Sequence, residues 1–218
     1  MEKIKYAIFD ADGTLMDSMH IWDTLDSAFL MMRGIEPKES RVFRKYGYFN
    51  AIKYFLENYE LNMTPEEIRA DIMKILEYYY NNVATAKDGV REFLQTLKDN
   101  GVRCVVATAT DRYLMEPALE RNGLLEYFDA VFSTRETGIS KHEPDIFNKA
   151  KEFLGADEDI FFFEDAAYAI DTAKKAGYKV VAVEDYSAEE EREQIRAVAD
   201  YYATNYAEMY QIFDLQVK

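Results

Sequence analysis

The sequence predicts an α/β protein with a Rossmann-like core, built on a parallel five-stranded sheet, and with an α-helical subdomain inserted into that core. Two observations carry this prediction. Five short apolar runs alternate with segments of helical period, which is the pattern of a parallel sheet covered by helices on both faces. Roughly 90 residues separate the first run from the second, far more than the usual loop of about 2 to 6 residues plus one helix.

The predicted strands are short runs rich in β-branched, aromatic and other apolar residues. They cover residues 4–9, 102–107, 130–132, 160–163 and 179–183. The segments between the later strands carry apolar residues at spacings of three and four, as at Val90, Phe93 and Leu97, and this spacing predicts helices. Near the C-terminal end, Ser187 and Glu190 form a capping-box pattern, so we expect the acidic run there to be an exposed first helical turn.

The long stretch after the first strand has a helical pattern throughout. Apolar residues recur with helical spacing in 21–32, 52–59 and 68–79. Thr64, Pro65 and Glu67 supply an N-cap, a first-position proline and a capping-box glutamate for the last of these helices. We therefore assign residues 16–86 to a helical subdomain, and residues 1–15 and 87–218 to the α/β core.

The composition restricts the partners. The 218 residues include 26 Lys plus Arg and 41 Asp plus Glu, which gives a net charge of −15 and a pI near 4.6. Such a surface repels nucleic acid and anionic lipid, so we expect neither as a partner. The single cysteine, Cys104, lies in an apolar run, and no signal-peptide core or long apolar segment is present. We expect a cytoplasmic protein.

Two carboxylates stand where the first predicted strand ends, in the segment Asp10-Ala11-Asp12-Gly13-Thr14. In an extended chain, residues two apart point to the same face. Open α/β sheets bind their ligands at the carboxyl ends of their strands, so this pair lies where a site is expected. A solvated turn with Asx hydrogen bonds explains this segment equally well when it is taken alone.

Three more polar features follow later strands in the same way. Thr108 follows the second strand, Lys141 follows the third, and Glu164-Asp165 follows the fourth. Each has an ordinary structural explanation, as a helix cap, a loop lysine or a helix-start acidic pair. Together they supply a nucleophile, a hydroxyl, a cation and an acidic cluster able to bind a metal.

With these motifs in this order, the chain resembles the haloacid dehalogenase-like superfamily. It is most similar to the branch with a helical cap after the first strand, which resembles β-phosphoglucomutase and phosphoglycolate phosphatase. The segment 10–14 is similar to the family's first motif, Thr108 to its second, Lys141 to its third, and Glu164-Asp165 to its acidic fourth. The resemblance covers nearly the whole chain and implies that residues 16–86 form the cap.

The resemblance implies a role for each residue. Asp10 would be the nucleophile that takes up the phosphoryl group, and Asp12 would protonate the leaving oxygen and then activate water. Thr108 and Lys141 would bind phosphoryl oxygens. The implied Mg²⁺ site consists of Asp10, the main-chain carbonyl of Asp12, the side chain of Asp165 and, nearby, Glu164. A hard divalent cation would offset the repulsion within this acidic cluster, and ligands that are all oxygen favour Mg²⁺ over Zn²⁺.

The chain departs from the family pattern at two places. The third motif is commonly Gly-Lys-Pro-x-Pro, but here Lys141 is followed by His142 and Glu143 before Pro144. In the cap, β-phosphoglucomutases carry a phosphate-contacting arginine shortly after a glycine, whereas Gly47 is followed by Tyr-Phe-Asn. The nearby cations Arg41, Arg44 and Lys45 are alternatives to that arginine, although exposed helix positions explain them more simply.

These observations favour a Mg²⁺-dependent phosphatase acting on a small phosphorylated metabolite, as a monomer or weak dimer. A phosphomutase with the same nucleophile is the main alternative, which the missing cap arginine disfavours. Dehalogenation does not need the acidic cluster, and a non-catalytic binding protein would normally lack a reacting group. His20 and the cap aromatics around Trp22 and Tyr48 are further candidates for substrate contact, and a packing role fits the aromatics as well.

Overall fold

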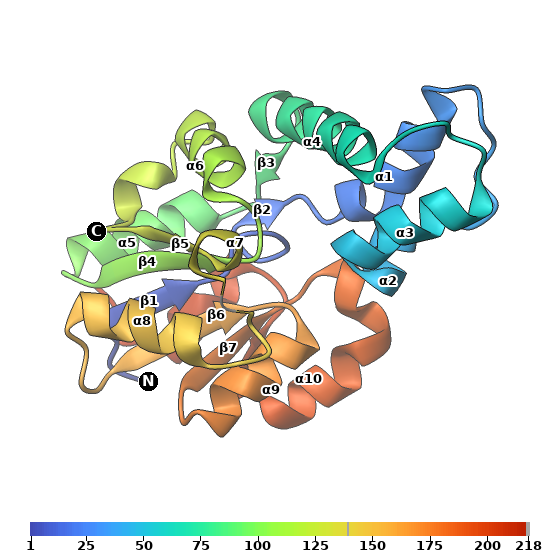
Figure 1. Ribbon diagram of the computed structural model, residues 1–218. Coiled ribbons are helices and arrows are strands. Elements are labelled where there is room, and N and C mark those ends of the chain that lie inside the picture. The colour runs from blue at the N-terminus through green and yellow to red at the C-terminus, as the bar shows by residue number, and fades with distance from the viewer. Residues whose placement is uncertain (139, 217–218) are drawn as a thin grey trace. The chain divides into compact units, whose positions relative to one another are not determined.

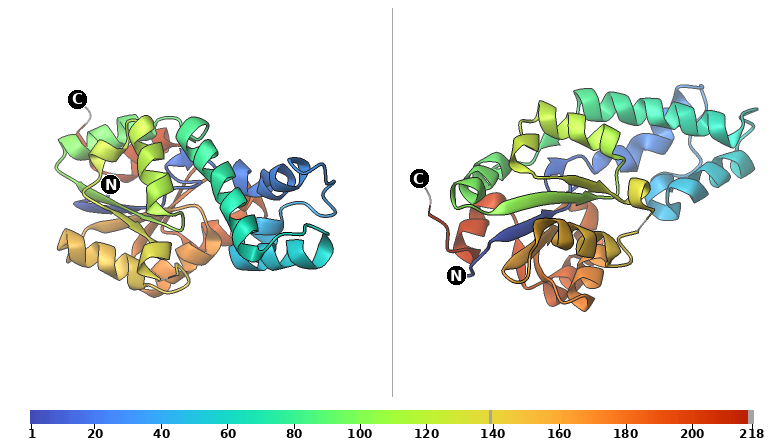
Figure 2. Two further views of the ribbon diagram at one scale, coloured as in Figure 1. Left: turned by 45° about the horizontal axis from the view of Figure 1, so that its top comes forward. Right: turned by 60° about the vertical axis from the view of Figure 1, so that its left-hand side comes forward.

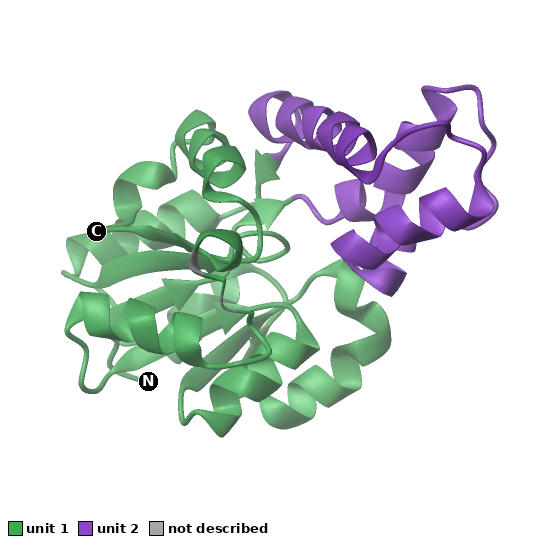
Figure 3. Ribbon diagram, viewed as in Figure 1, with its two compact units in different colours: residues 1–17, 85–218 green, residues 18–84 purple. Residues whose placement is uncertain are grey.

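The structure is a computed structural model that describes residues 1–138 and 140–216. The chain divides into two compact units (Figure 3), one made of residues 1–17 and 85–218 and the other of residues 18–84. The larger unit is an α/β structure, and the smaller one is helical. Among the described residues, none of the helices combines the length and the apolar character needed to span a bilayer.

The larger unit is built on a six-stranded parallel sheet with the strand order β5-β4-β1-β6-β7-β8 (Figure 1). Its strands are β1 (Tyr6–Phe9), β4 (Arg103–Thr108), β5 (Val131–Ser133), β6 (Ile160–Glu164), β7 (Lys179–Val183) and β8 (Tyr201–Ala203). All five predicted strands are present, and the α/β, Rossmann-like class is confirmed. The sequence prediction missed β8, because three residues between Asp200 and Thr204 are too short a run to show a strand pattern.

Helices cover both faces of this sheet (Figures 1 and 2). One face packs against α8 (Asp145–Leu154), α9 (Ala167–Lys175) and α10 (Arg192–Val198), and the other faces α5 (Val90–Asp99) and α6 (Arg112–Arg121). The alternation is clear on β6, where Phe162 joins the α8 and α9 core while Phe163 stacks on Phe9 at 4.2 Å and lies 5.9 Å from Phe93 of α5. Phe161, Phe162 and Phe163 are all fully buried, as expected for a strand covered on both faces.

Short elements complete the larger unit. They are the antiparallel pair β2 (Met16–Asp17) and β3 (Thr85–Ala86), the helices α7 (Thr134–Thr137) and α11 (Met209–Ile212), and the 3-10 helices Leu125–Tyr127, Tyr186–Glu191 and Tyr206–Glu208. The capping box predicted at Ser187 is wrong. Asp185 caps this segment instead, because its carboxylate accepts the Ser187 N–H at 2.9 Å, and the segment begins as a 3-10 helix.

The helical unit contains α1 (His20–Met31), α2 (Val42–Tyr46), α3 (Tyr48–Asn58) and α4 (Pro65–Asn82). The capping box predicted at the start of α4 is confirmed: Thr64 Oγ1 accepts the Glu67 N–H at 3.2 Å, and Glu67 accepts the Thr64 N–H at 2.8 Å. Phe29 of α1 and Phe55 of α3 are fully buried, with ring centroids 5.2 Å apart. The fully buried side chains of this unit thus supply a core of its own.

Candidate active site

Asp10 lies at the carboxyl edge of the sheet, directly after the central strand β1. Its N–H donates to the carbonyl of Phe163 at 2.9 Å, which extends the β1–β6 pairing by one residue and aligns Asp10 with the end of β6. Glu164 is the last residue of β6. Lys141 Nζ donates to Oδ1 of Asp10 and, at 2.8 Å, to Oε2 of Glu164. The structure thus brings together three of the predicted site residues from separate parts of the chain.

The Lys141 ammonium is buried, with only 3% of its side chain exposed. Burial lowers the pKa of Lys141, but the carboxylates of Asp10 and Glu164 outweigh burial and raise it, so the ammonium keeps its charge. Burial and the Glu164 charge raise the pKa of Asp10 to about 8, and Lys141 opposes that rise. A strongly raised pKa thus lies where the sequence predicted a nucleophile, as is common at functional sites.

Three buried carboxylates gather at this edge of the sheet. Asp10, Glu164 and Asp165 each offer an oxygen, and these oxygens lie within 4.8 Å of one another. Burial, followed by the charges of Glu164 and Asp10, raises the pKa of Asp165 well above its ordinary value. When ionised, the three carboxylates exceed the single Lys141 charge by two, which a divalent cation would balance. The set of oxygen donors fits a divalent metal site.

The loop that follows β1 holds Asp165 in place. Thr14 Oγ1 donates to Asp165 Oδ1 at 3.0 Å, and the hydroxyl of Tyr206 donates to the Thr14 carbonyl at 2.9 Å. At Gly13, φ is +82°, and a Cβ there would collide with the Asp165 carboxylate, so both conformation and space require glycine. Tyr206 could not be predicted from the sequence, because no motif or spacing marks it.

Asp12 and Thr108 are linked through a residue that the sequence analysis also missed. Thr110 Oγ1 donates to Asp12 Oδ2 at 2.6 Å, and the Thr110 N–H donates to Thr108 Oγ1 at 3.0 Å. Thr108 is the last residue of β4 and is fully buried. The signal that could have revealed Thr110 is the repeated threonine in Thr108-Ala109-Thr110. The Asp12 side chain is not part of the carboxylate cluster found among the described residues, and a metal contact through its main-chain carbonyl stays a prediction.

The other candidate residues have partners within their own unit. Arg44 contacts Asp23 at 3.0 Å, Arg41 lies 3.6 Å from the same carboxylate, and Lys45 pairs with Glu39. The ring nitrogens of His20 lie 3.0 and 3.3 Å from the Tyr79 hydroxyl. In the larger unit, the His142 ring packs against the Tyr168 ring in a tilted contact, with 4.5 Å between centroids. Trp22 is half-buried, and 72% of Phe49 is exposed.

Comparison with known proteins gives the same family as the motifs. Residues 7–183 match the family described as haloacid dehalogenase-like hydrolase. A protein named "Putative pyrophosphatase PpaX" from Caldanaerobacter subterraneus is 29% identical over 190 residues, covering 83% of this chain and 82% of the relative. The phosphorylated carbohydrates phosphatase of Thermotoga maritima is 25% identical over 173 residues, covering 78% and 80%.

Solved structures share the fold. A crystal structure titled as that of a "putative beta-phosphoglucomutase" from Thermotoga maritima has a TM-score of 0.78 and 23% identity, covering 97% of this chain and 98% of that one. The motifs, the carboxylate cluster and the family match over residues 7–183 agree. From this agreement it follows that the chain belongs to the haloacid dehalogenase-like hydrolase family.

Proposed function

We propose that this chain is a Mg²⁺-dependent phosphatase that hydrolyses a small organic phosphate ester through an aspartyl-phosphate intermediate on Asp10. The observation that carries the proposal is the contact of Lys141 with both Asp10 and Glu164, beside a third buried carboxylate, Asp165. Relatives of similar length are named as phosphatases, which supports a small phosphorylated substrate.

In the first half-reaction, a carboxylate oxygen of Asp10 attacks phosphorus. The new bond joins Asp10 to the phosphoryl group while the ester P–O bond breaks. The leaving oxygen takes its proton from Asp12, whose other oxygen is held by Thr110 at 2.6 Å. Thr108 and Lys141 would bind the phosphoryl oxygens, and Lys141 would offset their negative charge.

In the second half-reaction, the ionised Asp12 takes a proton from water as the water oxygen attacks phosphorus. The bond between phosphorus and Asp10 breaks, which releases inorganic phosphate and restores the Asp10 carboxylate. Asp12 thus returns to its protonated form. Covalent capture on Asp10 divides one difficult displacement into two easier steps.

The metal would be held by the Asp10 and Asp165 side chains and the Asp12 main-chain carbonyl, with Glu164 nearby. When bound, Mg²⁺ would neutralise charge that builds up on the phosphoryl oxygens. We propose that residues 16–86 act as the cap that selects substrate, and that the enzyme works in the cytoplasm as a monomer or weak dimer, without nucleic-acid or membrane partners.

The test is phosphate release from p-nitrophenyl phosphate with and without Mg²⁺, for the native chain, Asp10→Asn and Asp129→Asn. Asp129 is a matched control because its carboxylate is exposed and pairs with Arg103 on the surface. We expect Mg²⁺-dependent release that only Asp10→Asn abolishes. Isomerised sugar phosphate without phosphate release would indicate a mutase, and a folded protein with neither activity nor Mg²⁺ binding would overturn the proposal.

A further inference from the structure

The rings of His142 and Tyr168 form a close, tilted aromatic contact, called the stack below, beside the buried Lys141. Their ring centroids are 4.5 Å apart and their planes make an angle of 31°. This distance is at the close end of the range for aromatic pairs. The stack is partly exposed, since 42% of Tyr168 is accessible, whereas Lys141, the neighbour of His142 in sequence, is buried.

The stack joins two segments that carry site residues. His142 belongs to the turn that carries Lys141, and Tyr168 lies in the first turn of α9, three residues after Asp165. Burial raises the pKa of the Tyr168 hydroxyl and the Lys141 ammonium opposes that rise, so the hydroxyl lies within electrostatic range of the ammonium. A contact between the rings therefore couples the position of the Lys141 turn to the segment that follows the acidic pair.

Among the described residues, two hydrogen bonds lie inside the turn, and both are accepted by Ser140. The Glu143 N–H donates to the Ser140 carbonyl at 3.1 Å, and the His142 N–H donates to Ser140 Oγ at 3.2 Å. These two bonds fix the shape of the turn, whereas its attachment to the rest of the unit comes from side chains, including the contacts of Lys141 with Asp10 and Glu164. A proline at position 142 would restrict the backbone through its ring, and histidine supplies no such restriction.

We propose that the His142–Tyr168 stack is a positioning pair, which holds the turn so that the Lys141 ammonium stays between Asp10 and Glu164. The stack thus supplies by side-chain packing the restraint that a proline ring would supply through the backbone. This inference rests on the proposed phosphatase function, in which Lys141 binds the phosphoryl group.

The test is a set of variants assayed with p-nitrophenyl phosphate and saturating Mg²⁺. We expect His142→Ala and Tyr168→Ala each to lower kcat about tenfold, because small misplacements of a catalytic group cost this much or more. The double variant should be no worse than either single variant. Tyr168→Phe keeps the ring and should retain native kcat. His142→Pro should also retain native kcat. When Tyr168→Ala is added to His142→Pro, it should no longer lower kcat.

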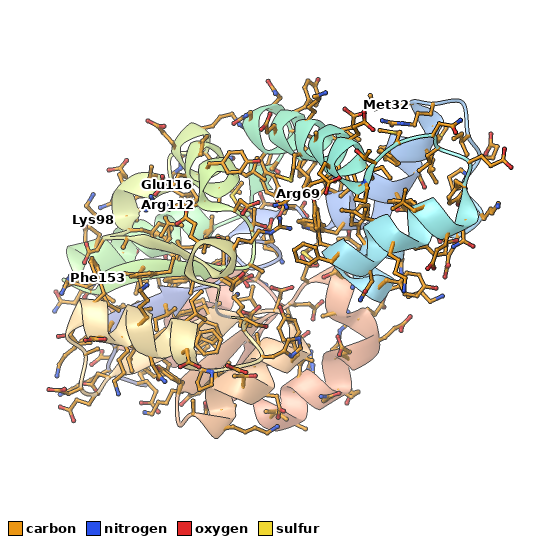
Figure 4. All side chains as sticks on the ribbon, in the orientation of Figure 1. Met32, Arg69, Lys98, Arg112, Glu116 and Phe153 are labelled. Atoms are coloured by element: carbon orange, nitrogen blue, oxygen red, sulfur yellow. The ribbon has the colours of Figure 1, made fainter. Side chains whose placement is uncertain are left out.

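Two controls separate the stack from general damage. Phe153 lies at the end of α8 away from the Lys141 turn (Figure 4), and its ring centroid is 5.6 Å from that of Phe132. Phe153→Ala removes this aromatic pair and should leave kcat unchanged. Ser140→Ala measures the hydrogen bond that His142→Pro also loses. The proposal is overturned if His142→Ala keeps native kcat, if the two alanine effects multiply, or if His142→Pro is impaired beyond the loss seen in Ser140→Ala.

Hydrogen exchange of the backbone amides in residues 140–149 gives a measurement independent of activity. We expect faster exchange there in His142→Ala and Tyr168→Ala but not in Phe153→Ala, and unchanged exchange would overturn the proposal. If the native chain releases no phosphate, the proposed function fails, while the exchange result still decides whether the stack holds the turn.

Discussion

The hydroxyl of Thr110 donates a hydrogen bond to Oδ2 of Asp12, with 2.6 Å between the two oxygens. This is a short hydrogen bond between two oxygen atoms. This bond fixes the orientation of the Asp12 carboxyl group, which is the proposed proton donor. Thr110 is itself held by Thr108, so the strand β4 orients the proposed general acid.

Replacing Thr110 by valine keeps the shape of the side chain and removes this hydrogen bond. A hydrogen bond to a charged group contributes about 1.5–3 kcal/mol, so we expect kcat to fall roughly 10- to 100-fold with little change in KM. Steady-state kinetics would measure this. Thr134→Val, at an exposed hydroxyl that donates to the Ala109 carbonyl at 3.4 Å, is the control. Native kcat in Thr110→Val would show that Asp12 needs no such support.

Removing divalent metal should destabilise the larger unit, because the carboxylates of Asp10, Glu164 and Asp165 then repel one another. We expect Mg²⁺ to raise the melting temperature of protein treated with a chelator, with a stabilisation of about 2.7 kcal/mol at a hundred times its Kd. Asp165→Asn should weaken this effect strongly. A melting temperature that does not respond to Mg²⁺ in the native chain would contradict a metal site at this cluster.

Tyr206→Phe should weaken Mg²⁺ binding without touching a metal ligand. The Tyr206 hydroxyl fixes the Thr14 carbonyl, and Thr14 in turn fixes Asp165. Loss of this buried bond should cost about 1 kcal/mol in the free energy of unfolding and raise the Mg²⁺ Kd about 3- to 10-fold. Calorimetric titration would measure the Kd. Tyr202→Phe, which loses a hydroxyl bonded to Glu184, should leave the Kd unchanged.

Asp26 should make the stability of the chain depend on pH. It is fully buried on α1, and burial raises the pKa of its carboxyl above 3.8, although the backbone at Val42 and Ser27 offsets part of the rise. A carboxyl whose pKa is higher in the folded state stabilises that state at low pH, and this contribution is lost as pH rises through the folded pKa. Asp26→Asn removes the titration.

The unfolding free energy of Asp26→Asn relative to the native chain should therefore rise from about pH 4 towards neutral pH, by on the order of 1 kcal/mol. Chemical denaturation at several pH values would measure this difference. Glu57→Gln, at an exposed carboxylate of the same unit, should not reproduce the curve. A difference that is constant with pH would mean that the pKa of Asp26 is the same in the folded and unfolded states.

Most of the larger unit could be predicted from sequence because its strands are buried on both faces. Such strands read as continuous apolar runs, as in the three phenylalanines of β6. The edge strand β8 has only three residues, and it pairs with β7, which lies about 20 residues earlier in the chain. The residue pattern within β8 does not reveal this pairing. The Asp185 cap was missed for a related reason, since several acidic and hydroxyl residues there compete for one helix start.

The candidate site was predictable where chemistry and strand ends coincide, as for Asp10, Thr108 and Glu164. The supporting groups could not be found in this way. Tyr206 lies almost 200 residues after Thr14 in sequence, and only the fold brings its hydroxyl to the Thr14 carbonyl. Thr110 lies two residues after the predicted Thr108, but sequence alone does not say that its hydroxyl faces Asp12 and not solvent.

The position of β1 in the sheet has a consequence for biosynthesis. This strand is made first, yet its two neighbours, β4 and β6, are made roughly 100 and 150 residues later. Until the ribosome has released β6, the segment that carries Asp10 has no partner on that side. The helical unit, by contrast, is continuous in sequence and can pack its own core while the rest of the chain is still being synthesised. The nascent chain therefore carries an apolar strand with at least one unpaired edge until β6 has been made, and this is the interval in which protection by a chaperone would matter.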